Sequence, residues 1–100
     1  MLYLIPTLRT TETDAYLFLA QHDAHVWILE RNDTSMRIRW LQPGKCHYAD
    51  QLWRLVIAGR NGVCAVSGQP VRKGDAVYRP DGRRYASNAG VTIREDAIRP

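Results

Sequence analysis

Two cysteines and three histidines are the residues through which this chain could bind a metal. Cys64 begins the stretch Cys-Ala-Val-Ser-Gly, which has the spacing of a zinc knuckle except that Ser67 replaces the second cysteine. A structural zinc takes four ligands, normally thiolates and imidazoles, and a neutral hydroxyl is a poor substitute for a thiolate. If a zinc site exists, its candidate ligands are Cys46, Cys64, His22 and His25.

That ligand set has no recognised zinc spacing. Cys46 and His47 are adjacent, so on an extended segment their side chains point to opposite faces. The alternative is a simple hairpin in which Cys64 is a buried thiol that packs as a small hydrophobe between Val63 and Val66. We predict the hairpin, with no metal and no cofactor, and keep a zinc-binding, knuckle-like domain as an alternative. A disulfide between the two cysteines is not expected in a reducing compartment.

Cys46-His47 is also the pair that most suggests nucleophilic catalysis. A thiolate–imidazolium pair must converge to hydrogen-bond distance, whereas neighbours on a strand diverge. The sequence contains no G-x-S-x-G, glycine-rich phosphate loop or H-E-x-x-H. A β domain of 100 residues also has little volume for a closed pocket. We therefore predict that the protein is not an enzyme.

Basic residues predict a binding surface instead. Residues 1–50 hold five Lys/Arg and six Asp/Glu, whereas residues 51–100 hold nine and four. Arginine beside tyrosine suits phosphates, stacked bases or acidic peptides. The candidate binding residues are Arg37, Arg39, Arg72, Lys73, Tyr78, Arg79, Arg83, Arg84 and Tyr85. The simpler alternative is that these arginines keep exposed strands soluble and prevent edge-to-edge pairing.

A helix is the first element expected to position these residues. The segment TTETDAYLFLAQHDA, residues 10–24, offers Thr11 and Asp14 as a weak capping pair. Tyr16, Leu17 and Leu19 would then form part of an apolar helix face. At about three turns, such a helix needs tertiary packing to persist.

Strands are predicted from residue 25 onward. HVWILER and SMRIRWL are separated by Asn-Asp-Thr-Ser, which is typical of a turn. In the second run, Ile38 and Trp40 alternate with Arg37 and Arg39, which predicts an apolar inner face and a cationic outer face. Three further runs, at 51–58, 62–66 and 75–79, resemble strands. The turn at 80–82 would allow residues 70–74 and 79–84 to form one basic patch.

The fold class predicted is mainly β (α+β). We expect a small, strongly bent sheet or an SH3-like or Tudor-like open barrel, with one N-terminal helix. The tail 87–99 fits either a short C-terminal helix or a strand through 91–93, and we favour the helix. The length suits a single domain, 1–100, made of an N-terminal helical segment (1–24) and a β-rich part (25–98).

Two long motifs and a short one carry a family resemblance. They are RIRWLQPGKCHYADQLW at 37–53, GVCAVSGQPVRKGDAVYRP at 62–80, and Asn88-Ala89. Together they resemble an uncharacterised proteobacterial family, domain of unknown function 3331. The resemblance covers roughly residues 25–98 and leaves the N-terminal helix outside. It implies no activity, cofactor or partner.

These observations predict a small, non-catalytic bacterial binding or regulatory module. The apolar start MLYLIP is too short for a signal sequence or a membrane span, so we expect a cytoplasmic protein that does not contact a membrane. A protein partner is favoured, because the basic charge comes without a nucleic-acid recognition motif. A nucleic-acid-binding accessory domain, acting through the basic second half, is the main alternative.

Overall fold

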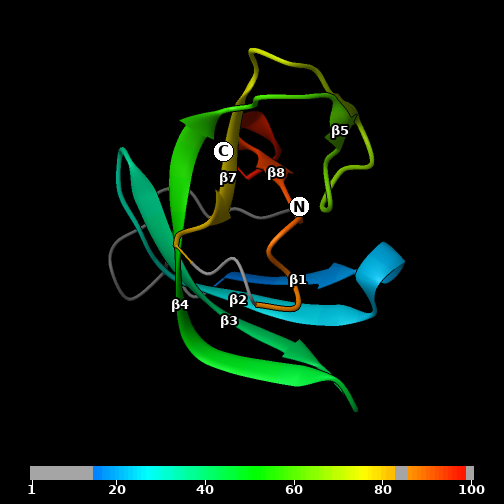
Figure 1. Ribbon diagram of the computed structural model, residues 1–100. Helices are drawn as coiled ribbons and strands as arrows, with labels where there is room; N and C mark the ends of the chain where they lie inside the picture. Colours follow the sequence, from blue (N-terminus) through cyan, green and yellow to red (C-terminus); the bar gives the residue numbers. More distant parts are fainter. Residues whose placement is uncertain (1–14, 83–85, 99–100) are drawn as a thin grey trace.

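Short antiparallel strands form the framework of the protein. The computed structural model describes residues 15–82 and 86–98 (Figure 1). Eight strands are defined within these residues: β1 (Ala15–Leu19), β2 (Ala24–Arg31), β3 (Ser35–Gln42), β4 (Cys46–Ile57), β5 (Gly62–Val63), β6 (Pro70–Val71), β7 (Ala76–Pro80) and β8 (Ile93–Arg94).

Six of the described strands build one sheet in the order β1-β2-β3-β4-β7-β8. Every pair in this sheet is antiparallel, and β5 and β6 form a separate small hairpin. The register shifts near Ile28 and Glu30, and again near Ile38 and Trp40. Such bulges add local twist, and the sheet curls into the half-barrel visible in Figure 1. The mainly β, strongly bent sheet predicted from the sequence is therefore confirmed.

The core lies on the inner side of this curled sheet. On β3, Met36, Ile38 and Trp40 are buried, whereas Arg37 and Arg39 are exposed, which confirms the alternation predicted for this strand. The ring of Trp40 stacks on that of Trp53 from β4, with centroids 6.0 Å apart and planes 26° apart. Two bulky rings on neighbouring strands thus hold the centre of the core.

A buried pair of amide side chains attaches the 86–92 segment to the sheet. The Nε2 of Gln51 donates to Oδ1 of Asn88 at 2.9 Å, and the Nδ2 of Asn88 donates to Oε1 of Gln51 at 2.9 Å. The indole N–H of Trp53 donates to the same Gln51 oxygen at 2.9 Å. Both amides are almost fully buried, so these bonds replace the water that the groups lose on folding.

The predicted N-terminal helix is wrong in its described part. Ala15–Leu19 forms strand β1, Ala20–His22 forms a single 3₁₀ turn, and Asp23 closes the turn with φ 50°. Pairing with β2 supplies backbone hydrogen bonds that a helix of about three turns would have to supply alone. Residues 10–14 of the predicted helix lie outside the described residues.

The tail also differs from the helix that we favoured. Residues 93–94 form β8, and Glu95–Ala97 forms one 3₁₀ turn, so the described part of the tail contains no α-helix. Ile93 is fully buried and lies opposite Tyr78 of β7. Burial of this one side chain against the sheet selects the extended alternative.

Candidate functional site on the outer face of the sheet

The arginines of β3 are less available for a ligand than their exposure suggests. Arg37 donates from Nε to Oδ1 of Asp50 at 2.9 Å and from Nη1 to Oε1 of Glu30 at 3.0 Å. The hydrogen bonds and positive charge of Arg37 lower the pKa of Asp50 below its ordinary value. Arg39 lies over the ring of Trp27, with Cζ 5.9 Å from the ring centroid. The charge of Arg37 is therefore already matched by two carboxylates.

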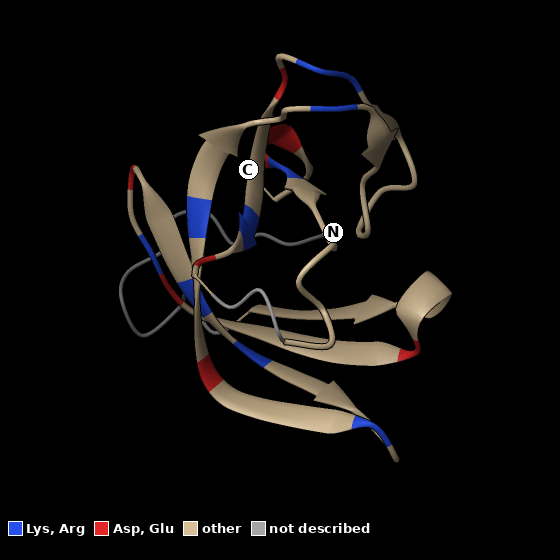
Figure 2. Cartoon of the chain, in the orientation of Figure 1, with Lys and Arg blue, Asp and Glu red and all other residues tan. Residues whose placement is uncertain are grey.

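The second group of predicted residues does not form one patch in the described structure. Arg72 and Lys73 lie in the loop before β7, whereas Arg79 lies near the other end of this extended strand. In Figure 2 the positions of the basic residues are spread over several strands and loops. Arg83, Arg84 and Tyr85 lie outside the described residues.

Tyr78 requires a correction. It was expected beside the arginines on the surface, but only 1% of it is exposed. It faces Leu55 of β4 on one side and Ile93 of β8 on the other. Tyr78 is therefore part of the buried core and not a surface binding residue.

A cluster of aromatic side chains on the outer side of β1 and β2 was not predicted. The strand register places Tyr16 opposite Trp27 and Phe18 opposite His25. Ring centroids are 5.4 Å apart for Tyr16 and Trp27, and 5.1 Å apart for Phe18 and His25. The Tyr16 hydroxyl lies 2.8 Å from Nδ1 of His25. We call these four rings, together with Arg39 over Trp27, the aromatic face.

The aromatic face follows from alternation along two strands. On β1, Leu17 and Leu19 point inward and Tyr16 and Phe18 point outward, each with 49% of its surface exposed. Aliphatic and aromatic residues alternate in AYLFL, but all five are apolar, so the sequence alone did not separate a strand from a helix. Trp40 and Trp53 are core residues as expected, whereas Trp27 is only partly buried.

A comparison with known protein families identifies the family to which this chain belongs. The family described as domain of unknown function (DUF3331) matches residues 10–99. The chain belongs to this family. The match begins at residue 10, so it includes most of the N-terminal segment that the resemblance to residues 25–98 left out. No curated protein and no solved structure matches the chain.

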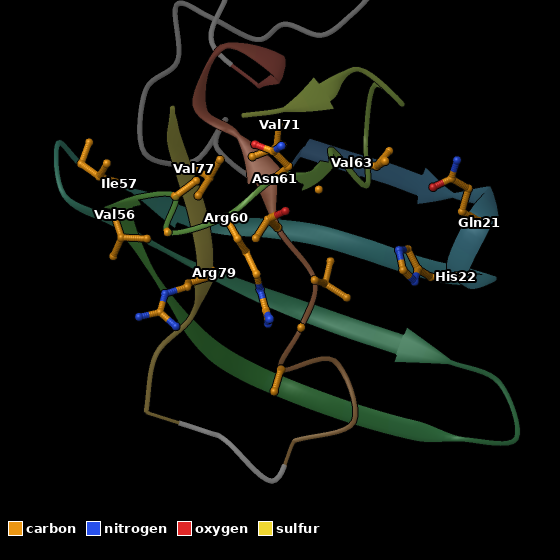
Figure 3. Close-up of a pocket in the computed structure, with 17 residues that line it drawn as sticks. Gln21, His22, Val56, Ile57, Arg60, Asn61, Val63, Val71, Val77 and Arg79 are labelled. Carbon is orange, nitrogen blue, oxygen red and sulfur yellow. The ribbon is translucent and has the colours of Figure 1, made fainter. Parts of the chain in front are cut away.

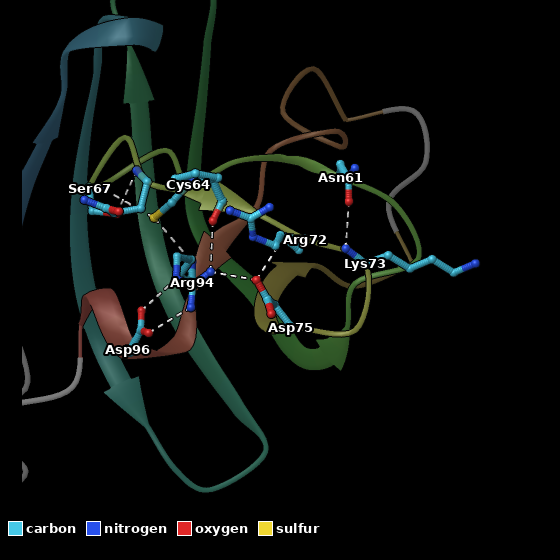
Figure 4. A network of polar contacts seen from close by, with 10 residues as sticks. Asn61, Cys64, Ser67, Arg72, Lys73, Asp75, Arg94 and Asp96 are labelled. Atoms are coloured by element: carbon cyan, nitrogen blue, oxygen red, sulfur yellow. Dashed lines mark hydrogen bonds and ion pairs between the residues drawn. The ribbon is translucent and has the colours of Figure 1, made fainter.

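The knuckle of the DUF3331 domain is a hydrogen-bonded turn. The thiol of Cys64 is fully buried and accepts N–H groups from Ser67 at 3.4 Å and from Arg94 at 3.3 Å (Figure 4). The N–H of Gly68 donates to the carbonyl of Cys64 at 2.9 Å, and Gly68 has φ 75°. Ser67 Oγ accepts the N–H of Gln69 at 3.3 Å. The turn is therefore held by its own backbone and by the start of the tail.

The candidate zinc ligands are not gathered together. Cys46 lies on β4, where Ser87 Oγ donates to its sulfur at 3.0 Å, and His25 lies on the aromatic face. Within residues 15–82 and 86–98, no three Cys, His, Asp or Glu side chains are grouped closely enough to hold a metal ion. Both cysteines are free thiols.

We predict that the reduced, purified DUF3331 domain contains no stoichiometric zinc and melts at the same temperature with and without a chelator. The reason is that no three Cys, His, Asp or Glu side chains of the described residues lie close enough to hold a metal ion, and that Ser67, in the position of the second cysteine, has a neutral hydroxyl. Elemental analysis and thermal melts measure this directly. About one zinc per chain, or a chelator-induced fall in melting temperature, would contradict it because structural zinc adds folding energy.

Arg94 connects the knuckle to the loop before β7. Its Nη1 donates to Oδ2 of Asp75 at 2.7 Å and to the carbonyl of Pro70 at 2.9 Å, and its other nitrogens bind both oxygens of Asp96. Asp75 also accepts the N–H of Arg72 at 2.8 Å. The hydrogen bond from the backbone N–H of Arg72 is the largest cause that lowers the pKa of Asp75, and the hydrogen bond from the Arg94 side chain is the second. These contacts are visible in Figure 4 and position a loop rather than a reacting group.

This network predicts a pH-dependent contribution to stability. Because the pKa of Asp75 is lower in the folded state than in the unfolded chain, its contribution is complete above the unfolded pKa of about 4 and is lost as the pH falls through the folded value. Asp75→Asn should therefore destabilise the protein at pH 7, and the difference from wild type should shrink below about pH 4. Urea denaturation at several pH values checks this. A difference independent of pH would rule out the carboxylate charge as its cause.

The described residues include no helix long and apolar enough to cross a membrane. The arrangement on the outer side of the sheet offers ring surfaces, one guanidinium over the ring of Trp27, and the Tyr16 hydroxyl within hydrogen-bond distance of His25.

Proposed function

We propose that the DUF3331 domain is a non-catalytic binding module that docks a protein partner through the aromatic face. The observation that carries this proposal is a cluster of four neighbouring rings on the outermost described strand, β1, and on β2, of which Tyr16 and Phe18 are each 49% exposed. Exposed apolar groups that form a contiguous patch mark interaction sites more often than scattered ones do. The same proposal includes a regulatory role. It also includes use of the curled sheet as a binding surface, as in SH3-like or Tudor-like barrels.

The chemistry of the aromatic face suits a protein–protein interface. Tyrosine, tryptophan and arginine are enriched at interface centres because they bury a large area with few rotatable bonds. Tyr16, Trp27 and Arg39 are already ordered against one another, so little further entropy is lost on binding. The outer position of β1 also suits an extended peptide that adds to the sheet edge.

Charge balance favours a protein over a nucleic acid. Arg37 and Arg39 beside this face are offset by Glu30 and Asp50. Nucleic-acid affinity depends mainly on cations that neutralise phosphates. The alternative function nevertheless has one specific observation in its favour, since rings stacked on a sheet surface suit unpaired bases. Two free thiols are compatible with a reducing cytoplasm, which is the proposed location.

The test compares wild type with a double variant of the aromatic face, Phe18→Ala with Trp27→Ala. Ile57→Ala is the matched control, since Ile57 is an exposed apolar residue on the unrelated strand β4. Proteins captured from nuclease-treated extract by wild type are purified, and their affinity for each variant is measured. Truncating interface centres should weaken binding by about thirtyfold or more, while the control leaves it unchanged.

Three outcomes would contradict the proposal. Equal affinity of the double variant and wild type would remove the aromatic face from the interface. Loss of capture after nuclease treatment, with micromolar binding of single-stranded DNA or RNA, would promote the nucleic-acid alternative. A defect in Ile57→Ala alone would place the contact elsewhere.

A further inference from the structure

A second surface feature of the chain is an open hollow of about 580 Å³. Its walls come from the 3₁₀ turn at Ala20–His22, the loop after β4, strand β7 and the 89–92 segment (Figure 3). Five of the lining residues are valines, namely Val56, Val63, Val71, Val77 and Val91, of which Val71 and Val77 are almost fully buried. The volume lies within the range of small-molecule sites, and aliphatic walls give such a site its apolar character.

The charged residues of the hollow are all basic. Arg60 and Arg79 line it, and none of the described lining residues is Asp or Glu. Both arginines are exposed, and neither has a carboxylate partner among the described residues. By contrast, Arg54, which lies opposite Arg79 in the sheet, is 3.2 Å from Asp81. Two arginines without an ion-pair partner among the described residues thus line the hollow.

We propose that this hollow binds a small organic anion: a carboxylate carried on an apolar body. The planar guanidinium matches a carboxylate with two parallel hydrogen bonds, and each such bond to an ionised group is shorter and stronger than a neutral one. The valine walls would cover the apolar body of the ligand. A neutral ligand would gain no charge-assisted hydrogen bond from the arginines, and inorganic phosphate would leave the valine surface wet.

This inference goes beyond the proposed function, because it uses residues outside the aromatic face. None of Tyr16, Phe18 and Trp27 lines the hollow. A protein partner and a small anion could therefore be tested separately, and failure of one would leave the other intact.

The test is calorimetric titration of the full chain with octanoate. We expect saturable binding of one octanoate per chain. Arg60→Ala with Arg79→Ala should weaken it by about tenfold or more, as expected for lost charge-assisted hydrogen bonds. Arg72→Ala is the matched control, since Arg72 is an exposed arginine that does not line the hollow. The neutral octanamide and inorganic phosphate should each bind at least about tenfold more weakly than octanoate.

Several results would overturn the inference. One is the absence of saturable octanoate binding up to about 10 mM. Another is equal affinity of the double variant and wild type, provided that both melt at the same temperature. Octanamide binding as tightly as octanoate would remove the role of the arginines, and tighter binding of an apolar peptide with a free carboxyl terminus would assign the hollow to a protein ligand.

Discussion

Replacing Ile38 with alanine is expected to lower the free energy of unfolding by about 2–5 kcal/mol. Ile38 is fully buried in the centre of β3, between Met36 and Trp40 along the inner face. The substitution removes three carbon atoms and leaves a cavity that close-packed neighbours fill only in part. Urea denaturation followed by tryptophan fluorescence measures the loss, and Trp40 and Trp53 report on the same core.

Arg39→Ala is the matched control on the adjacent position. Its side chain is exposed and makes one recognised contact, with the ring of Trp27. An exposed cation–π contact contributes about 0.5 kcal/mol, so the loss should not exceed roughly that value. Because a one-residue slip moves every side chain to the opposite face, comparable losses at Ile38 and Arg39 would mean that the register of β3 is wrong.

Replacing Asn88 should have the second large effect. Asn88→Ala removes two of the three side-chain hydrogen bonds of the buried Gln51, at a cost of about 1–3 kcal/mol. Asn88→Asp should cost more at neutral pH. A carboxylate cannot donate to Oε1 of Gln51, and its charge would be buried without a cation.

The two Asn88 variants respond differently to pH. Burial should raise the pKa of the carboxyl introduced by Asn88→Asp above its unfolded value, so its protonated form favours folding. The Asn88→Asp variant should therefore recover part of its stability as the pH falls towards about 4, relative to Asn88→Ala. Urea denaturation at pH 7 and at lower pH measures both effects. The neighbouring exposed Ser87→Ala serves as the control, with an expected change within about 0.5 kcal/mol.

A double-mutant cycle with Gln51→Ala separates this pair from simple loss of packing. Residues that share a hydrogen-bond network are expected to show a coupling energy of about 0.5–3 kcal/mol. A coupling energy near zero would mean that the amide pair is not what attaches the 86–92 segment to the sheet.

Some features were determined by the sequence alone. The strand over residues 35–42 was predictable because Ile38 and Trp40 alternate with Arg37 and Arg39, and a period of two leaves one choice of inner face. The turns were predictable for a similarly local reason. Gly68 and Gly74 have positive φ, which glycine adopts without the steric cost that a Cβ imposes. The two long motifs were sufficient to indicate the family that the comparison then identified.

Other features were decided only by the tertiary structure. Residues 15–19 have apolar side chains that fit either a helix or a strand, and pairing with β2 selects the strand. Tyr78 lies beside Arg79 in the sequence but belongs to the core, where it lies opposite Ile93 of β8, fifteen residues further along the chain. The sequence shows no partner for the charge of Arg37, but strand pairing places Asp50 and Glu30 within hydrogen-bond distance of it.

The common reason is the range of the interaction. Alternation and turn geometry depend on residues that are adjacent in the chain, so both can be predicted from the sequence. The aromatic face and the hollow with Arg60 depend on which strands lie side by side and on how strongly the sheet curls. Those outcomes come from backbone pairing and burial between distant segments, and a local pattern does not specify its partner.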